Sequence, residues 1–150
     1  MTTVAWDGKE MAADGMSVIH GQKHRSQAKV RRLPDGSLAA YAGRADLGEA
    51  FLRWLGAGGD AEPGQRPNIQ AGDDEEITVL QAMPDGTTRL HNAYGWSLVD
   101  APFAIGSGGD FAYTAMKLGL SATDAVATAI GIDVYSGWPI EALALREGGA

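Results

Sequence analysis

The sequence lacks several features that would point to particular classes of protein. It has no cysteine, which excludes a disulfide framework and thiol chemistry. Its 12 Lys and Arg are outnumbered by 19 Asp and Glu, and the formal net charge of -7 argues against nucleic acid or an anionic membrane as the main partner. No window approaches the ~20 apolar residues of a membrane span, and the start does not resemble a signal peptide. We therefore expect a soluble, cytoplasmic protein.

The 150 residues, 45% of them hydrophobic, are enough for one domain over 1–150, because a chain of this size buries roughly 70% of its unfolded surface. Helical spacing of apolar residues predicts helices at 45–55, 107–118 and 121–134, with Ser121 as the N-cap of the last. The polar segment 20–27 and the Gly/Pro/Asp-rich segment 57–74 are predicted loops. Short runs predict strands at 3–6, 10–14, 16–19, 28–33, 38–42, 76–83, 87–91, 95–99, 103–106 and 140–145. This order predicts an α+β fold.

The first residues, Met1-Thr2-Thr3, offer a nucleophile. If Met1 is removed, Thr2 carries a hydroxyl and a free α-amine on one residue. That amine has a reference pKa near ~8, so much of it is neutral at physiological pH and able to accept the hydroxyl proton. The small threonine side chain is compatible with Met1 removal, and we expect maturation to need no self-cleavage. The alternative is an inert, frayed terminus.

A series of short motifs follows in order: Ala13-Asp14-Gly15, Lys29-Val30-Arg31-Arg32-Leu33, Ala42-Gly43 with Ala45-Asp46, Ala104-Ile105-Gly106-Ser107-Gly108-Gly109, and Asp133-Val134-Tyr135-Ser136-Gly137. Together with Thr2-Thr3, this set resembles the successive motifs of proteasome β-type subunits, in particular the bacterial HslV-type peptidase subunit. The resemblance runs from Thr2 to about Leu145. It implies an N-terminal-nucleophile hydrolase with a four-layer αββα sandwich of antiparallel sheets.

The resemblance also implies a role for individual residues. Thr2 is the nucleophile, and Lys29 with its partner Asp14 lowers the pKa of the threonine hydroxyl. Gly43 supplies the backbone N–H for the substrate oxyanion, although the stretch 42–46 is one residue shorter here than in the family. The amine is oriented by Ser107, Asp133 and Ser136. Carbonyls near 133–136 hold a sodium or magnesium ion in relatives, while no cofactor is required for the reaction.

Taken singly, these residues have simpler interpretations. Asp14 begins an Asp-Gly turn, Lys29 fits a solvated strand, and Ser107 suits a helix N-cap. Asp133 and Ser136 fit the end of a helix. Gly106 to Gly109 lacks the Gly-Lys-Ser/Thr of a phosphate loop. His20 and His24 are spaced like helix-borne metal ligands, but a solvated pair is the simpler interpretation because no third ligand is evident. The acidic run 73–76 indicates a solvated edge.

The implied function is a threonine-type peptidase acting on peptides or proteins. A small-molecule amidase and a catalytically silent ring subunit are the alternatives. Family members carry two long helices after the strand near Gly43, through which their rings stack, whereas here only 45–55 has a helical pattern. We therefore expect a shortened helical layer and a homo-oligomer with altered stacking, a single ring or an open spiral. An ATPase unfoldase partner stays undecided.

Overall fold

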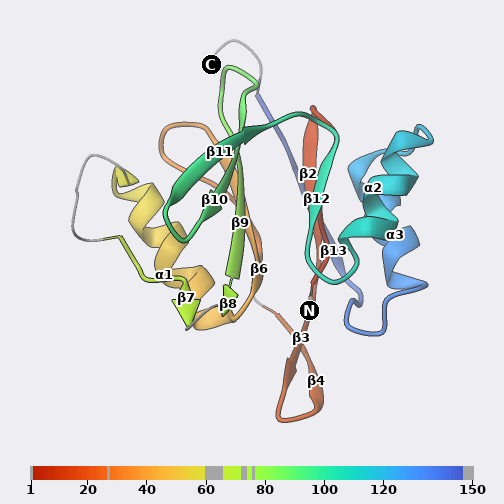
Figure 1. The fold of residues 1–150 in the computed structure, drawn as a ribbon. Coiled ribbons are helices and arrows are strands. Elements are labelled where there is room, and N and C mark those ends of the chain that lie inside the picture. Colours follow the sequence, from red (N-terminus) through yellow and green to blue (C-terminus); the bar gives the residue numbers. More distant parts are fainter. Residues whose placement is uncertain (1, 27, 60–65, 72–73, 76, 147–150) are drawn as a thin grey trace.

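Two antiparallel sheets form the centre of the structure, a computed structural model that describes residues 2–26, 28–59, 66–71, 74–75 and 77–146 (Figure 1). Within these residues, the first sheet has the order β12-β1-β2-β13, and the second has the order β11-β10-β9-β6-β5. The first sheet comprises β1 (Val4–Trp6), β2 (Glu10–Asp14), β12 (Phe103–Ile105) and β13 (Ile140–Ala144). The second comprises β5 (Val30–Arg32), β6 (Leu38–Gly43), β9 (Ile77–Ala82), β10 (Thr88–Asn92) and β11 (Gly95–Val99).

The sheets are held together by a shared apolar core. Trp6 and Met11 from the first sheet are fully buried with Leu38 and Leu80 from the second. Trp6 also donates a hydrogen bond from its indole Nε1 to the Thr88 hydroxyl at 2.9 Å, so its polar atom is satisfied inside the core. Burial of these large side chains fixes the first strand, and with it the amino end of the chain, between its neighbours β2 and β12.

Helices cover the outer face of each sheet (Figure 1). Helix α1 (Ala45–Gly56) packs Phe51 and Leu52 against the five-stranded sheet. Helices α2 (Gly109–Lys117) and α3 (Ala122–Ile130) pack small residues, mostly alanine, against the four-stranded sheet. Ser121 caps α3 by accepting a hydrogen bond from the Asp124 N–H at 3.1 Å, as predicted. The predicted α+β class and its antiparallel sheets are confirmed. No described helix is both long and apolar enough to cross a membrane.

Three local predictions were wrong. The segment 20–27 is not all loop, because β4 (Gln22–Arg25) pairs with β3 (Met16–Ile19) in a hairpin whose exposed side chains need no apolar pattern. The segment 57–74 is not wholly exposed, because Ile69 is fully buried against α1 and the short strands β7 (Gln70–Ala71) and β8 (Asp74–Glu75) pair beyond it. Helix α3 ends at Ile130 rather than near 134, because Gly131 follows as its C-cap. The remaining acidic positions, 73 and 76, lie outside the described residues.

Candidate active site

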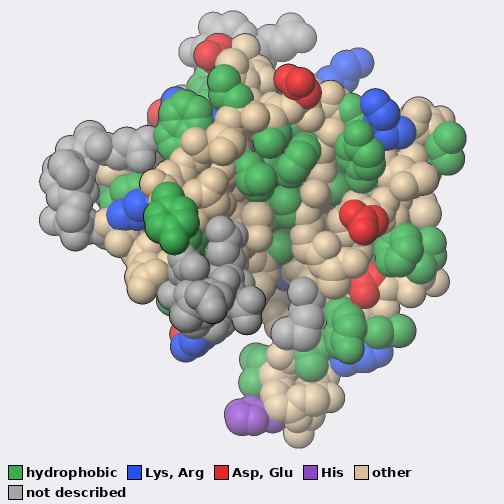
Figure 2. Space-filling view, in the orientation of Figure 1, with side chains coloured by type: hydrophobic (Ala, Val, Ile, Leu, Met, Phe, Trp, Pro, Cys, Tyr) green, Lys and Arg blue, Asp and Glu red, His purple; other side chains and the backbone are tan. Residues whose placement is uncertain are grey.

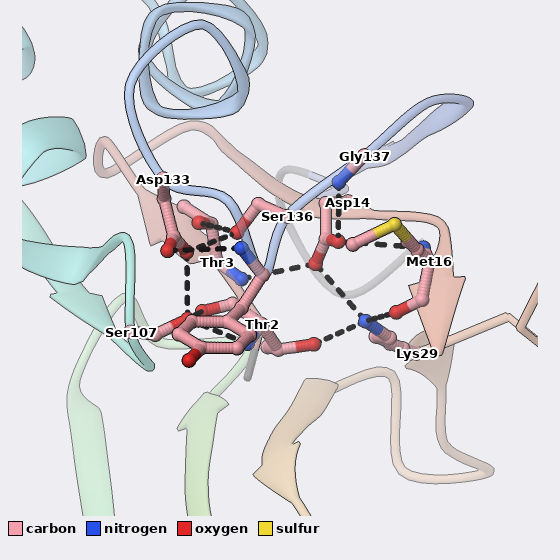
Figure 3. Close-up of polar contacts among 10 residues, drawn as sticks. Thr2, Thr3, Asp14, Met16, Lys29, Ser107, Asp133, Ser136 and Gly137 are labelled. Atoms are coloured by element: carbon pink, nitrogen blue, oxygen red, sulfur yellow. Dashed lines mark hydrogen bonds and ion pairs between the residues drawn. The ribbon is translucent and has the colours of Figure 1, made fainter. Parts of the chain in front are cut away.

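Thr2 lies just before β1, and only 2% of its surface is exposed. Its backbone N–H donates to the Ser107 hydroxyl at 3.1 Å, and its carbonyl accepts from the Gly108 N–H at 3.2 Å. Its side-chain oxygen Oγ1 accepts a hydrogen bond from the Nζ of Lys29 (Figure 3). The loop between β12 and α2 therefore holds the backbone of Thr2, while a lysine contacts its hydroxyl.

Lys29 precedes β5 and is 4% exposed. Its three ammonium donors have three partners: Thr2 Oγ1, Asp14 Oδ1 at 3.0 Å and the Met16 carbonyl at 2.8 Å. Burial lowers the pKa of Lys29, and the neighbouring Asp14 carboxylate only partly opposes this effect. Burial thus makes the ammonium proton easier to lose than in an exposed lysine, while the Asp14 carboxylate favours the charged form that donates to the Thr2 hydroxyl.

Asp14 connects the parts of the site. It ends β2 and is almost fully buried. Its Oδ1 accepts from the Thr3 N–H at 2.9 Å as well as from Lys29, and its Oδ2 accepts from the Gly137 N–H at 3.0 Å and the Met16 N–H at 3.3 Å. A buried carboxylate needs this many donors. The interpretation of Asp14 as a simple turn residue, and of Lys29 as a solvated one, therefore does not hold.

A second carboxylate lies on the other side of the amino end. Asp133 Oδ2 accepts hydrogen bonds from the hydroxyls of Ser107 and Ser136, each at 2.6 Å. The Ser136 hydroxyl is also 2.7 Å from that of Thr3. Burial of Asp133 acts to raise its pKa, but the hydrogen bonds from Ser107, Ser136 and the Tyr135 N–H outweigh it, so the pKa lies below the ordinary 3.8. The carboxylate thereby fixes Ser107 as an acceptor toward the Thr2 nitrogen.

Glycines allow the close approach of these segments. Gly106 has a φ of +94°, and a Cβ there would collide with the Thr2 carbonyl. A Cβ on Gly108 would collide with the Thr3 hydroxyl and lie 3.2 Å from Asp133 Oδ2. Ser107 is not the N-cap of α2; that position is Gly108, without a side-chain bond. The glycine-rich turn thus serves the amino end rather than a phosphate.

Thr2 and Lys29 both line a cleft of about 890 Å³. One wall is the β3–β4 hairpin, through Ser17 to His20, and the other is the beginning of α1, through Arg44 to Asp46. Gly43 ends β6 with a φ of +113° and also lines this cleft. The cleft is therefore bounded by the β3–β4 hairpin, the end of β6 and the beginning of α1, with Thr2 and Lys29 also in its lining.

Comparison with solved structures gives the fold. BPH from Thiobacillus denitrificans is 21% identical with a TM-score of 0.66 over 97% of this chain and 98% of that one. The same protein in complex with epoxomicin gives a TM-score of 0.69 over 97% and 100%. HslV from Trypanosoma brucei is 22% identical with a TM-score of 0.67 over 95% and 98%. The chain has the proteasome β-subunit fold. No family model and no curated protein matches the sequence.

All the predicted polar site residues of this proteasome-like fold meet in one cluster: Thr2, Asp14, Lys29, Ser107, Asp133 and Ser136. Gly43 stands apart from the hydrogen-bond network but shares the cleft. Two participants were not among the residues predicted from the sequence. Thr3 was detectable, because side chains alternate along a strand and its hydroxyl must face away from that of Thr2. The Met16 carbonyl was not, because a backbone acceptor leaves no mark in the sequence.

A metal ion is not needed to explain the cluster. Within the described ranges, no three His, Asp or Glu side chains group as metal ligands. The carboxylate oxygens of Asp133 already accept from Ser107, Ser136 and Tyr135. Backbone carbonyls would have to supply most of the ligands of any ion near 133–136. The sodium or magnesium ion there stays a prediction.

Proposed function

We propose that the protein is a threonine-type peptidase that uses Thr2, freed of Met1, as its nucleophile. The observation that carries this proposal is the contact of Lys29 Nζ with the Thr2 hydroxyl inside an open cleft. A lysine buried for stability alone would need its carboxylate partner, and Asp14 supplies it. Another N–H of the Lys29 ammonium donates instead to the hydroxyl of Thr2, the residue that would carry a free amine after removal of Met1.

In this proposal the hydroxyl proton passes to the neutral α-amine as Oγ1 attacks the peptide carbonyl, while Lys29 stabilises the developing alkoxide. Collapse of the tetrahedral intermediate breaks the C–N bond, and the amine returns the proton to the leaving nitrogen. Water, deprotonated by the same amine, then hydrolyses the Thr2 ester. Ser107, whose hydroxyl donates to Asp133, holds the Thr2 nitrogen at 3.1 Å in this cycle.

The oxyanion donor in this scheme is the backbone N–H of Gly43, which lines the cleft beside Thr2. A donor held in place before the reaction stabilises charge that appears only in the transition state, and one such donor contributes on the order of 10²-fold to the rate. The support for Gly43 is its position at the end of β6 and the open approach that a residue without Cβ gives to a substrate carbonyl.

Peptide is the substrate that this cleft supports best. The cleft has a volume of about 890 Å³ and open walls, which suit several residues of an extended peptide chain. BPH, which shares the fold, forms a complex with epoxomicin, and we extend such binding to this cleft as part of the proposal. A small-molecule amidase uses the same chemistry. The hypothesis of a catalytically silent subunit does not account for the contact of Lys29 with Thr2 in addition to its ion pair with Asp14.

The test combines intact mass with hydrolysis of a fluorogenic peptide panel. We expect protein from a bacterial host to begin at Thr2 and to turn over at least one peptide, and Thr2→Ala to be inactive with an unchanged circular dichroism spectrum. Hydrolysis of amide-bearing small molecules, with no peptide cleaved, would favour the amidase. Retention of Met1 on nearly every chain, or peptide turnover by Thr2→Ala, would contradict the mechanism.

We further propose a cytoplasmic homo-oligomer whose ring stacking differs from that of family members. The described part of segment 57–75 contains β7 and β8 and no α-helix, so α1 lacks a described helical neighbour on its face of the sheet. Light scattering coupled to size exclusion tests this. We expect a single ring or an open spiral. A stable monomer would refute the oligomer, and a closed double ring would refute the claim that the missing helix matters. An unfoldase partner would be detected as ATP-dependent protein degradation.

A further inference from the structure

The β3–β4 hairpin, residues 16–26, concentrates positive charge on an otherwise acidic chain. It carries two cations, Lys23 and Arg25, beside His20 and His24 and contains no acidic residue, whereas the whole sequence has a net charge of -7 with histidine counted as neutral. All four strand residues of β4 are exposed. Figure 2 shows histidine at the end of this hairpin, where it projects from the body of the molecule.

This hairpin is part of the cleft wall rather than a remote surface. Ser17 and Ile19 line both the Thr2 cleft and a smaller adjoining cavity of about 320 Å³, which His24 and Arg25 also line. The register pairs Ser17 with His24 and Met16 with Arg25, so these side chains stand side by side on neighbouring strands. A chain leaving the Thr2 cleft along the hairpin would therefore pass Arg25.

The acidic side chains near the beginning of α1, on the opposite wall of the cleft, already form ion pairs with basic side chains. Asp46 accepts two hydrogen bonds from the Arg44 guanidinium, at 2.7 and 2.9 Å. Glu49 pairs with Arg31 at 2.5 Å and accepts from the Tyr41 hydroxyl at 3.1 Å. Among the described residues, by contrast, neither Lys23 nor Arg25 makes an ion pair. The charge that is left uncompensated at the mouth of the cleft is positive.

We propose that this hairpin makes the cleft select peptides with acidic side chains beside the bond to be cleaved, an inference that rests on the proposed peptidase function. An acidic segment is repelled by the net negative charge of the chain and attracted by the cations of the hairpin, which directs it toward Thr2. Because the hairpin charges are exposed, the attraction is modest for each pair and screened by salt.

The experiment measures binding on the Thr2→Ala protein, so that it does not depend on catalysis. Fluorescence anisotropy compares two labelled peptides of equal length that differ only in Glu against Gln at the flanking positions. We expect the Glu peptide to bind about 5-fold more tightly in low salt and about equally at ~0.5 M salt. Arg25→Gln with Lys23→Gln should bring the low-salt ratio to about one. Arg146→Gln removes one positive charge from a residue that lines neither cavity, and it should leave the ratio unchanged.

Equal binding of both peptides in low salt, binding of neither, or an equal effect of Arg146→Gln would overturn the proposal. So would an oligonucleotide that binds at the hairpin when the Glu peptide does not. The ratio of kcat/KM for the two peptides on the Thr2 protein separates the two hypotheses. If the Glu peptide binds selectively but neither peptide is hydrolysed, the peptidase function is refuted and the preference of the hairpin for acidic peptides stands. If both peptides are hydrolysed with the same kcat/KM, the peptidase function stands and the preference is refuted.

Discussion

The structure contains two buried polar networks that differ in composition and in access. In the five-stranded sheet, Gln81 bridges the Ser37 hydroxyl at 3.0 Å and the His91 ring at 2.9 Å, and all three are at most 4% exposed. At the amino end, Lys29 and Asp14 are equally buried. The first network joins polar side chains of neighbouring strands and contains no buried ion pair, although its Ser37 hydroxyl also donates to the exposed Asp35 carboxylate at 2.6 Å. The second joins an ion pair to the hydroxyl of Thr2.

The comparison shows that burial alone does not identify a candidate site. Gln81 links Ser37 and His91 within the sheet, and none of the three lines the Thr2 cleft. Lys29 instead has a pKa lowered by burial, and one of its three donors is directed to a residue on the cleft surface. A charged group held against a hydroxyl in the lining of a cleft is expected where a nucleophile is activated, and less so where strands are merely joined.

The largest expected effect comes from removing the hydroxyl. Thr2→Ala should lower kcat/KM for a cleaved peptide by about 10³-fold or more, because the nucleophile is lost. Its unfolding free energy should change by only about 1 kcal/mol, since one hydrogen bond of Lys29 is removed. Chemical denaturation and peptide turnover on the same preparation measure both quantities. A large loss of stability would make Thr2 a structural residue like Gln81.

Lys29→Met should be as inactive as Thr2→Ala and also unstable. It leaves the Asp14 carboxylate buried without a cation, which costs about 3–5 kcal/mol. The double variant Lys29→Met with Asp14→Asn should regain part of that stability, since no buried charge remains, and stay inactive. Urea denaturation compares the three proteins. Peptide turnover by Lys29→Met close to that of the unmodified protein would remove the distinction between the two networks.

Gln81→Leu tests the other buried network, the one in the five-stranded sheet. It removes the buried hydrogen bonds that Gln81 makes to the Ser37 hydroxyl and to the His91 ring, which should cost about 1–3 kcal/mol. Turnover at a temperature where the variant is folded should stay within about two-fold of the unmodified protein, because the change lies outside the cleft. A selective loss of kcat in folded Gln81→Leu would mean that the two networks are coupled.

The smallest effect concerns Asp133. Hydrogen bonds hold its folded pKa below the ordinary 3.8 despite burial, so its contribution to stability is complete above that value and is lost as pH falls through the folded pKa. Unfolding free energies measured between about pH 2.5 and 6 should therefore fall less steeply in Asp133→Asn than in the unmodified protein. Identical slopes for the two proteins would show that this carboxylate is not stabilised by Ser107 and Ser136.

Sequence reasoning found the polar residues of the site because their motifs follow in a recognisable order, although single motifs did not decide the matter. Asp14 has the signature of a turn, and only the fold brings the N–H groups of Thr3, Met16 and Gly137 to its carboxylate. The α+β class was predicted from the helical and strand periodicities of the apolar residues. Strand β4 was missed because both of its faces are exposed, and Ile69 because a single apolar residue in a glycine- and proline-rich stretch has no periodicity.

The central claim is that Thr2 is an activated nucleophile, and covalent labelling tests it most directly. A peptide epoxyketone presents a ketone to a hydroxyl and an epoxide to the adjacent amine, so it reports both groups of an amino-terminal threonine. Intact mass and peptide mapping should show one adduct per chain, confined to residue 2, on protein that begins at Thr2 and not on Lys29→Met. Protein that begins at Thr2, remains unlabelled at saturating reagent and cleaves no peptide would contradict the account.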